Sequence, residues 1–315
     1  MTRRWLLSMT LAASFTALPA GASATPQCAP AQSVTIGGAV GAPSTYSFSQ
    51  LQALPQSTFT VAHRQWSGSR IDTDQGVTIE TLVDAAQPTL PSVKNPLLRV
   101  TVEVSGDRGR AVTFALGELD PSFGNHPAYL ALEQDGRTLP APELVVPGDV
   151  DSARTLIAVN RITVAVHSPS PTTPPSAGAL TIEDGPSTRV LTASQLAALP
   201  ERTLNVTFEA GTASQSHVEI GPTLGAVLRA ARIRADLDTW VAAVGSDGYV
   251  ATATPAEAWI GARPLLISLN EDGTALAQPR LVTDGDIKGG RYVSDVVDLV
   301  IGHSPRPAWP WARAR

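Results

Sequence analysis

Apolar and polar residues alternate along many short stretches of this chain, which is the period-two pattern of half-buried β-strands. The pattern is clearest in residues 98–104, 156–164 and 293–301. It predicts further strands at residues 33–36, 58–62, 179–182, 203–207 and 239–244. Apolar runs at residues 128–132 and 265–269 are each followed by Asp-Gly, which predicts hairpins.

Four other segments repeat apolar residues at helical spacing. Residues 49–55 (S-Q-L-Q-A-L-P) and 194–200 (S-Q-L-A-A-L-P) predict short helices, with Ser49 and Ser194 as N-caps. Residues 76–86 and 221–231 predict two amphipathic helices, the second of which starts near Pro222. The chain has 25 glycines and 26 prolines, which favours many turns and short elements.

The predicted elements occur twice in the same order. Residues 144–154 (L-V-V-P-G-D-V-D-S-A-R) recur at residues 281–291 (L-V-T-D-G-D-I-K-G-G-R), 137 positions apart (281 − 144). The two S-Q-L helices are 145 apart (194 − 49). The duplication predicts an α+β protein with two tandem β-rich domains, residues 33–165 and 178–302. A Pro/Ser/Thr linker at residues 166–177 would join them.

Composition and charge narrow the function classes. The 315 residues are 43% hydrophobic and 16% charged, with a formal net charge of −5, so no basic face for nucleic acid is expected. No stretch is long and apolar enough to predict a transmembrane helix. Lys94 and Lys288 are the only lysines, so nearly all positive charge is carried by arginine.

The two ends of the sequence predict processing and disorder. Residues 1–24 resemble a signal peptide: Arg3 and Arg4 precede an apolar run, and A-S-A ends at Ala24. An extracytoplasmic protein, periplasmic or secreted, is therefore expected, by either the general or the twin-arginine export route. Cys28 is the only cysteine, so no disulfide within the chain can form. Residues 303–315 are expected to form a flexible tail.

Residue patterns for catalysis are weak, and two arginines are the best ligand candidates. The five histidines have no metal-ligand spacing, and no nucleophile elbow or dinucleotide-binding glycine motif occurs. Arg154 and Arg291 each follow a Gly-Asp loop, where a guanidinium can bind a phosphate with two parallel hydrogen bonds. The alternative is an ion pair within the domain, to Asp149 or Asp286 respectively.

The order of these landmarks resembles the sulfite oxidase-like molybdopterin-binding domain. V-V-P-G at residues 145–148 and A-R at residues 153–154 are similar to that family's V-V-P-G-x-x-G-A-R-x-V-K-W segment. The resemblance covers both copies, essentially residues 33–302. It implies a molybdenum ion carried on molybdopterin and attached to one protein cysteine. It also implies that the cofactor site would include Arg154 and Arg291.

The cysteine implied by the resemblance is missing from both copies. Its position falls on Ala62 in the first copy and on Thr207 in the second. Neither alanine nor a neutral hydroxyl can replace a soft thiolate toward molybdenum. We therefore expect an exported, degenerate protein without redox activity that binds a pterin, a small anion or a partner protein in the inherited cleft. Thr207 and His63 would then lie beside the ligand.

Two alternatives remain open from the sequence. The chain could be an active molybdopterin-dependent oxidoreductase that holds its metal through the cofactor alone or with a ligand such as His63. It could also be a structural or interaction protein, for which the basic, tryptophan-containing tail is the only indication.

Overall fold

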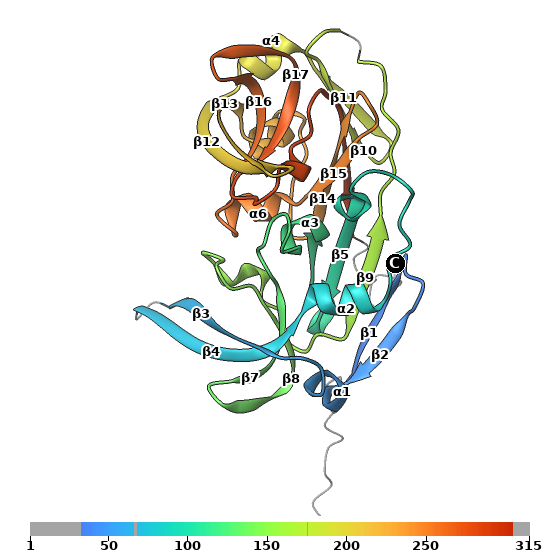
Figure 1. Cartoon of the computed structure of the whole chain (residues 1–315), viewed down its shortest axis with the longest axis vertical. Coiled ribbons are helices and arrows are strands. Elements are labelled where there is room, and N and C mark those ends of the chain that lie inside the picture. Colours follow the sequence, from blue (N-terminus) through green and yellow to red (C-terminus); the bar gives the residue numbers. More distant parts are fainter. Residues whose placement is uncertain (1–32, 66–67, 175, 305–315) are drawn as a thin grey trace, which may run out of the picture.

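The computed structural model describes residues 33–65, 68–174 and 176–304. The predicted signal peptide, Cys28, Trp66 and nearly all of the predicted tail lie outside the described residues. The described chain is rich in β-structure, with four sheets and a few short helices. Its two halves lie one above the other in Figure 1, the first half in blue to green and the second in yellow to red.

The first half contains two antiparallel-rich sheets. A five-stranded sheet has the order β2-β1-β9-β5-β6 and a four-stranded sheet has the order β3-β4-β7-β8. The strands of the first sheet are β1 (Ser33–Gly38), β2 (Ser44–Ser47), β5 (Val100–Ser105), β6 (Ala111–Ala115) and β9 (Arg161–Val166). Those of the second sheet are β3 (Ser57–Gln65), β4 (Gly68–Thr78), β7 (Tyr129–Gln134) and β8 (Arg137–Val145).

The second half repeats this topology strand for strand. Its sheets have the orders β11-β10-β18-β14-β15 and β12-β13-β16-β17. The first is formed by β10 (Leu180–Asp184), β11 (Ser187–Leu191), β14 (Thr239–Gly245), β15 (Val250–Ala253) and β18 (Val296–His303). The second is formed by β12 (Glu201–Ala210), β13 (Ala213–Pro222), β16 (Leu265–Glu271) and β17 (Thr274–Thr283).

Even the one parallel pairing of each half is conserved between them. β1 pairs in parallel with β9, with Thr35 opposite Arg161, and β10 pairs in parallel with β18, with Thr181 opposite Asp298. The neighbouring pairs are antiparallel in both halves. The predicted duplication of the architecture is therefore confirmed at the level of strand order. The linker is held against the second half, because the Thr172 backbone N–H donates to Asp298 Oδ2 at 2.6 Å.

The four helices that the sequence predicted begin at other residues than expected, because other residues act as their N-caps. α1 (Phe48–Gln52) and α4 (Ala193–Ala197) are capped by Ser47 and Thr192, not by Ser49 and Ser194, because each cap forms a reciprocal capping box with the glutamine three residues on. α2 (Ile79–Ala85) and α5 (Leu224–Ala230) start after a threonine cap. Pro222 is the last residue of β13 rather than the start of a helix.

Two further short helices and four single turns were not predicted. α3 (Leu116–Leu119) follows β6 and α6 (Pro255–Trp259) follows β15, at equivalent points of the two halves. The 3₁₀ turns are η1 (Pro96–Arg99), η2 (Asp107–Gly109), η3 (Ser152–Arg154) and η4 (Gly289–Arg291). No helix among the described residues is long and apolar enough to cross a membrane.

Each half has its own hydrophobic core between its two sheets. The first core includes Ile36, Val102 and Phe114, and the second includes Ile182, Val241 and Leu299, all fully or almost fully buried. The two halves also share a seam where β6 and β15, the edge strands of the five-stranded sheets, approach each other. There the Thr113 N–H donates to the Leu237 carbonyl at 2.9 Å, and the Thr252 hydroxyl donates to the Leu98 carbonyl at 2.9 Å.

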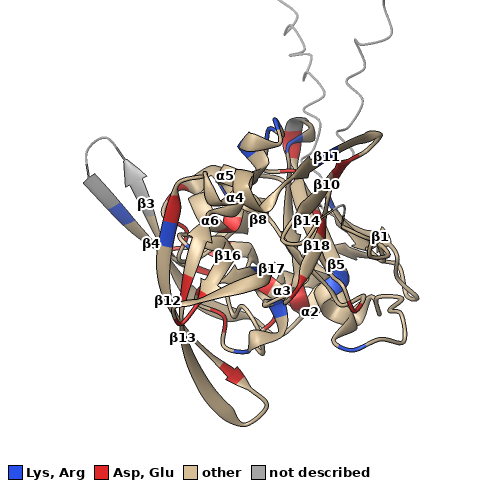
Figure 2. Ribbon diagram, turned by 90° about the horizontal axis from the view of Figure 1, so that it is seen from above, with Lys and Arg blue, Asp and Glu red and all other residues tan. Residues whose placement is uncertain are grey.

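Both four-stranded sheets carry a long two-stranded arm. β3 with β4, and β12 with β13, extend away from the body of the molecule in Figure 2. β3 and β12 are the edge strands of their sheets. The end of the second arm returns toward the body, since the Glu209 N–H donates to the Ile287 carbonyl at 2.7 Å.

Candidate functional site

The two arginines singled out by the repeat are both fully buried. Arg154 ends η3 and is fully buried. Its Nε and Nη2 atoms donate to the two carboxylate oxygens of Asp149 at 2.8 and 2.5 Å, and Nη1 donates to Glu118 Oε1 at 2.7 Å. The ring of Phe114 lies 5.1 Å from the guanidinium carbon. Arg154 is thereby held by two acids and one aromatic face.

Arg291 repeats this arrangement at the end of η4. It is also fully buried, and its Nε and Nη2 atoms donate to the carboxylate of Asp286 at 2.8 and 2.5 Å. Its Nη1 atom donates to Glu257 Oε2 at 2.6 Å. Such fork-to-fork pairs fix the orientation of the guanidinium as well as neutralising it. The ion pairs to Asp149 and Asp286, which the sequence left open as the alternative, are thus present in both halves.

The glutamates that complete these pairs were missed by the sequence reasoning. Glu118 lies on α3 and Glu257 on α6, and both are fully buried. The sequence did contain an indication of this pair. Glu118 and Glu257 are 139 positions apart (257 − 118), and this offset lies between the 137 and 145 of the other repeated landmarks. The surrounding residues differ, so the glutamate stood out only after the helices had been placed.

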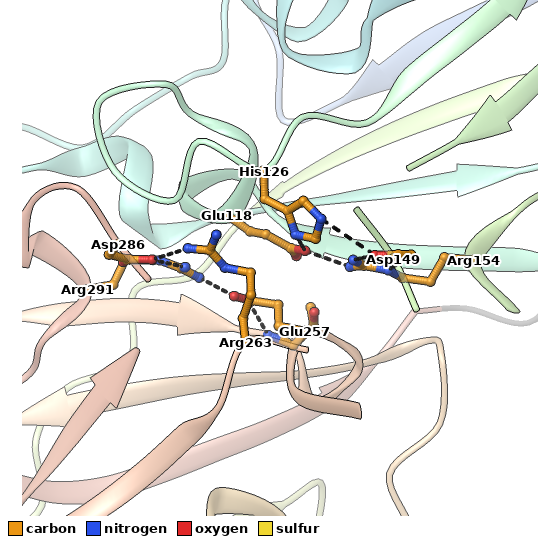
Figure 3. A network of polar contacts seen from close by, with 9 residues as sticks. Glu118, His126, Asp149, Arg154, Glu257, Arg263, Asp286 and Arg291 are labelled. Atoms are coloured by element: carbon orange, nitrogen blue, oxygen red, sulfur yellow. Dashed lines mark hydrogen bonds and ion pairs between the residues drawn. The ribbon is translucent and has the colours of Figure 1, made fainter. Parts of the chain in front are cut away.

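A histidine and an arginine occupy the fourth position of the two clusters. His126 Nδ1 lies 3.3 Å from Glu118 Oε1, and its Nε2 lies 3.6 Å from Asp149 Oδ1. Arg263, the equivalent residue 137 positions on, donates from Nη2 to Asp286 Oδ1 at 2.8 Å. Figure 3 shows the two clusters facing each other across the seam.

Burial and charge act in opposite directions on these groups. Burial by itself would raise the pKa of Glu118, but Arg154 and His126 hold that pKa down to about 2. Burial raises the pKa of Glu257, and the nearby carboxylate of Glu118 adds to the rise against the opposing effect of Arg291. Burial would lower the pKa of Arg291, but Asp286 and Glu257 raise it overall. Both guanidiniums are therefore charged at every working pH.

Reciprocal backbone hydrogen bonds join the clusters across the seam. The Val150 N–H donates to the Ile260 carbonyl at 2.8 Å, and the Ile287 N–H donates to the Phe123 carbonyl at 2.7 Å. The two donors, Val150 and Ile287, are 137 positions apart (287 − 150), and so are the two acceptors, Phe123 and Ile260 (260 − 123). The two halves therefore meet with an approximate two-fold relationship, and each landmark loop is attached to the other half.

The buried Arg291 positions a loop whose exposed side faces a cleft. Residues 288–290 (K-G-G) directly precede Arg291, and the Tyr249 hydroxyl donates to the Gly290 carbonyl at 2.6 Å. A Cβ atom on Gly290 would lie 2.3 Å from the Phe123 ring, and one on Gly289 would lie 2.5 Å from the Phe208 ring. The glycines thus allow two aromatic rings, one from each half, to pack on the loop backbone.

The cleft has a volume of about 680 Å³ and is lined by both halves. The first half contributes Lys94, Asn95 and Phe123, and the second half contributes the end of β12, the turn around Tyr249 and the loop from Lys288 to Asp295. Its lining includes both lysines of the chain and two of its four tyrosines, Tyr249 and Tyr292. A cleft of this volume is typical of small-molecule sites.

The charged side chains around the cleft are not paired with each other. Within the described part of the chain, neither lysine has a carboxylate oxygen within 4.0 Å, and the carboxylates of Glu209 and Asp295 have no basic partner. Asp247 accepts only the Tyr249 N–H, at 2.9 Å. The buried arginines, by contrast, have all of their acids in direct contact. Five charges at this cleft are therefore available to a ligand.

A small dent lies beside the equivalent loop of the first half. It has a volume of about 10 Å³ and is lined by Val61, Ala62, Val146, Asp149, Asp151, Ser152 and Thr155. Ser152 and Ala153 replace the two glycines, and Arg110 reaches the Ala153 carbonyl at 3.4 Å where Tyr249 reaches Gly290. The side chains of residues 63–69, which follow Ala62 on this side, lie outside the described residues.

Three of the four residues predicted to bind a cofactor, Arg154, Arg291 and Thr207, are not among the lining residues of the cleft. Arg154 and Arg291 are buried behind their loops, and Thr207 lies exposed on β12 with its hydroxyl 2.8 Å from the Ser216 hydroxyl. His63 is on β3, and its side chain lies outside the described residues. Ligand binding by these four residues stays a prediction. The residues that do line the cleft have no motif in the sequence.

The side chains at the implied metal position do not fit molybdenum. Ala62 lines the small dent and offers no donor atom, and Thr207 offers a neutral hydroxyl that is already hydrogen-bonded to Ser216. Molybdenum on a dithiolene takes a soft thiolate from the protein, which neither position supplies. No cluster of three or more metal-binding side chains occurs among the described residues.

Comparisons with known proteins find a likeness in structure and none in sequence. No protein-family model and no curated protein matches the chain. Among solved structures, the chain is similar to the sulfane dehydrogenase SoxCD from Paracoccus pantotrophus, at 14% identity and a TM-score of 0.34. That match covers 84% of this chain and 77% of the other.

Proposed function

We propose that this chain is an exported binding protein without redox activity, which holds a small organic ligand in the cleft between its two halves. The observation that carries the proposal is the cleft of about 680 Å³ at which both lysines of the chain meet unpaired carboxylates and four aromatic rings. Binding sites of this kind are concave, largely apolar and supplied with a few convergent polar groups.

The architecture around the cleft favours binding over turnover. The loop that carries Lys288 is fixed on its inner side by Arg291 and on its outer side by Tyr249. A rigid loop reduces the side-chain and backbone ordering that a ligand would otherwise have to impose. The pterin or small anion expected from the sequence belongs to the range of ligands that such a cleft could hold.

The proposal can be tested on the protein purified from its own compartment. We expect native mass spectrometry to show a co-purified small molecule, and metal analysis to show far less than one molybdenum per chain. The Lys94→Gln/Lys288→Gln double variant should lose the bound mass. Arg202→Gln, an exposed change on β12 away from the cleft, serves as the control and should keep it.

Two results would overturn the proposal. One is a molybdenum content of about one per chain, which would support the oxidoreductase alternative. The other is a bound mass that the double variant retains in full, because the ligand would then occupy another part of the molecule.

A further inference from the structure

Resting on this proposed function, we propose that the ligand of the cleft is a zwitterion with an aromatic body, of about dipeptide size. Its carboxylate would pair with Lys94 and Lys288, its ammonium with the acidic side chains of the rim, and its ring with the aromatic wall. This class differs from the simple anion expected from the sequence, and three features of the cleft lead to it.

The first feature is the charge of the lining. The lining contains two ammonium groups, those of Lys94 and Lys288, and three carboxylates, those of Glu209, Asp247 and Asp295. A simple anion would therefore enter a cleft whose own charge is already negative by one. Binding sites and ligands match in potential, and like charges brought together cost affinity. A ligand that carries one group of each sign uses both sets of side chains.

The second feature is how the charges are arranged. Glu209 and Lys288 belong to adjacent backbone segments, which form a parallel bridge at the end of β12. Lys94 extends over the ring of Tyr249, with Nζ 6.0 Å from the ring centre, and Asp247 lies two residues before that tyrosine. Each of these two groups of lining residues thus carries both signs of charge. A ligand with separated charges can contact both groups.

The third feature is the aromatic wall. Phe123, Phe208, Tyr249 and Tyr292 line the cleft, and the rings of Phe208 and Tyr292 lie 4.3 Å apart. The Tyr249 hydroxyl already donates to the Gly290 carbonyl and accepts from Asn95 Nδ2 at 2.9 Å. Tyr249 therefore offers its ring face rather than its hydroxyl. Offset or edge-to-face packing of a ligand ring on this wall would add to the burial of apolar area.

The cleft is too large to be filled by the smallest ligands. An inorganic anion would occupy a small part of about 680 Å³ and leave the aromatic wall in contact with water. A ligand of dipeptide size can reach the lysines and the carboxylates at once while it covers the rings. Apolar area removed from water is the main favourable contribution that such a wall can make.

A matched series of four peptides tests the inference by isothermal titration calorimetry. The probes are Phe-Phe, acetyl-Phe-Phe, which lacks the ammonium, Phe-Phe-amide, which lacks the carboxylate, and Ala-Ala, which lacks the rings. We expect Phe-Phe to bind, and each deletion to weaken binding about tenfold or more, since charge-assisted contacts and ring burial are each of that order. Equal affinity for Phe-Phe and acetyl-Phe-Phe would overturn the inference.

Two variants assign each charge of the ligand to its partner. Lys288→Gln should weaken Phe-Phe about tenfold but leave Phe-Phe-amide unchanged, because the amide has no carboxylate to lose. Glu209→Gln should weaken Phe-Phe and leave acetyl-Phe-Phe unchanged. A variant that weakens all four peptides alike would show that the lost group supports the loop rather than the ligand, which contradicts the assignment.

A fifth probe separates this inference from the proposed function. Pterin-6-carboxylate is aromatic and acidic but has no ammonium. If it binds in a manner that depends on Lys288 while Phe-Phe does not bind, the zwitterion inference is wrong and the binding function stands. If no probe binds and no co-purified mass depends on the two lysines, both proposals fail together.

Discussion

His126 and Arg263 occupy equivalent positions in the two halves, and each contacts the aspartate that pairs with the buried arginine of its own half. The second cluster therefore contains two arginines for its two acids, whereas the first contains one arginine and a histidine. Across the seam, four carboxylates face three guanidiniums and one imidazole. The second cluster therefore has one more permanently charged guanidinium than the first.

Removal of either buried arginine should be strongly destabilising. Arg154→Gln leaves Glu118 and Asp149 without their cation, and Arg291→Gln does the same to Glu257 and Asp286. Breaking a buried pair from one side costs about 3–5 kcal/mol, because the remaining charge stays out of water. Urea unfolding should show that loss for both variants, whereas Arg137→Gln, an exposed change on β8, should leave the midpoint almost unchanged.

The two arginine variants should differ in ligand binding. Only Arg291 supports the loop that carries Lys288, so Arg291→Gln should weaken cleft binding while Arg154→Gln should not. The comparison is made well below the unfolding midpoint of both variants. Equal loss of binding in both would indicate that the whole seam, and not the loop, sets the shape of the cleft.

A methyl group at Gly290 should disturb the cleft. Its Cβ would lie 2.3 Å from the Phe123 ring, which must move away from the loop. Forced shifts of this kind cost about 1–3 kcal/mol. Gly290→Ala should lower the melting temperature, and Phe123→Leu in the same chain should recover part of the loss. Gly37→Ala is the control, because no atom lies within 4 Å of the added Cβ there.

Glu80 makes the protein less stable as the pH rises. Burial, together with Asp120 and Asp84, raises its pKa to about 7, above the 4.5 of an unperturbed glutamate. The folded state then holds the proton more tightly than the unfolded chain, so stability falls between about pH 4.5 and pH 7. Glu80→Gln should raise the melting temperature at pH 8 more than at pH 4.5. The exposed Glu201→Gln should change both melting temperatures alike.

His167 should have the opposite pH dependence. Burial lowers its pKa to about 4. Its Nε2 lies 2.7 Å from the Thr101 hydroxyl, and its ring lies tilted against Trp240, with ring centres 3.7 Å apart. The unfolded state binds the proton first, so stability is lost as the pH falls from about 6.5 toward 4. His167→Gln should flatten urea-unfolding stability over that range. An unchanged slope in the variant would assign the acid sensitivity to other groups.

The sequence predicted the fold better than the site. The repetition of the strand order in the second half follows from the duplication, because the L-V-x-x-G-D landmark and the S-Q-L helices mark the same points of both halves. The missed helices α3 and α6 have four and five residues, and their buried sides leave no amphipathic period to detect. Their glutamates were missed with them. The choice of N-cap failed because two candidates, Ser47 and Ser49, compete within one turn.

The cleft could not be read from the sequence at all. Its lining runs from Lys94 to Asp295, and it comes from both halves. No local sequence pattern connects Lys94, which precedes η1, with Lys288, which lies in the second landmark loop. Only the reciprocal contacts across the seam bring them to one place. Gly290 lines the cleft where Ala153 stands in the first half, and the effect of this glycine depends on the Phe123 ring contributed by the other half.

The reciprocal bonds from Val150 to Ile260 and from Ile287 to Phe123 are those of a closed homodimer contact, formed here inside a single chain. Each half provides the partner surface that a homodimer would obtain from a second molecule. Assembly of this interface is consequently independent of protein concentration. Any association with a second molecule has to use a different surface. Residues on one side of the seam can also change without an identical change opposite them, as His126 and Arg263 have done.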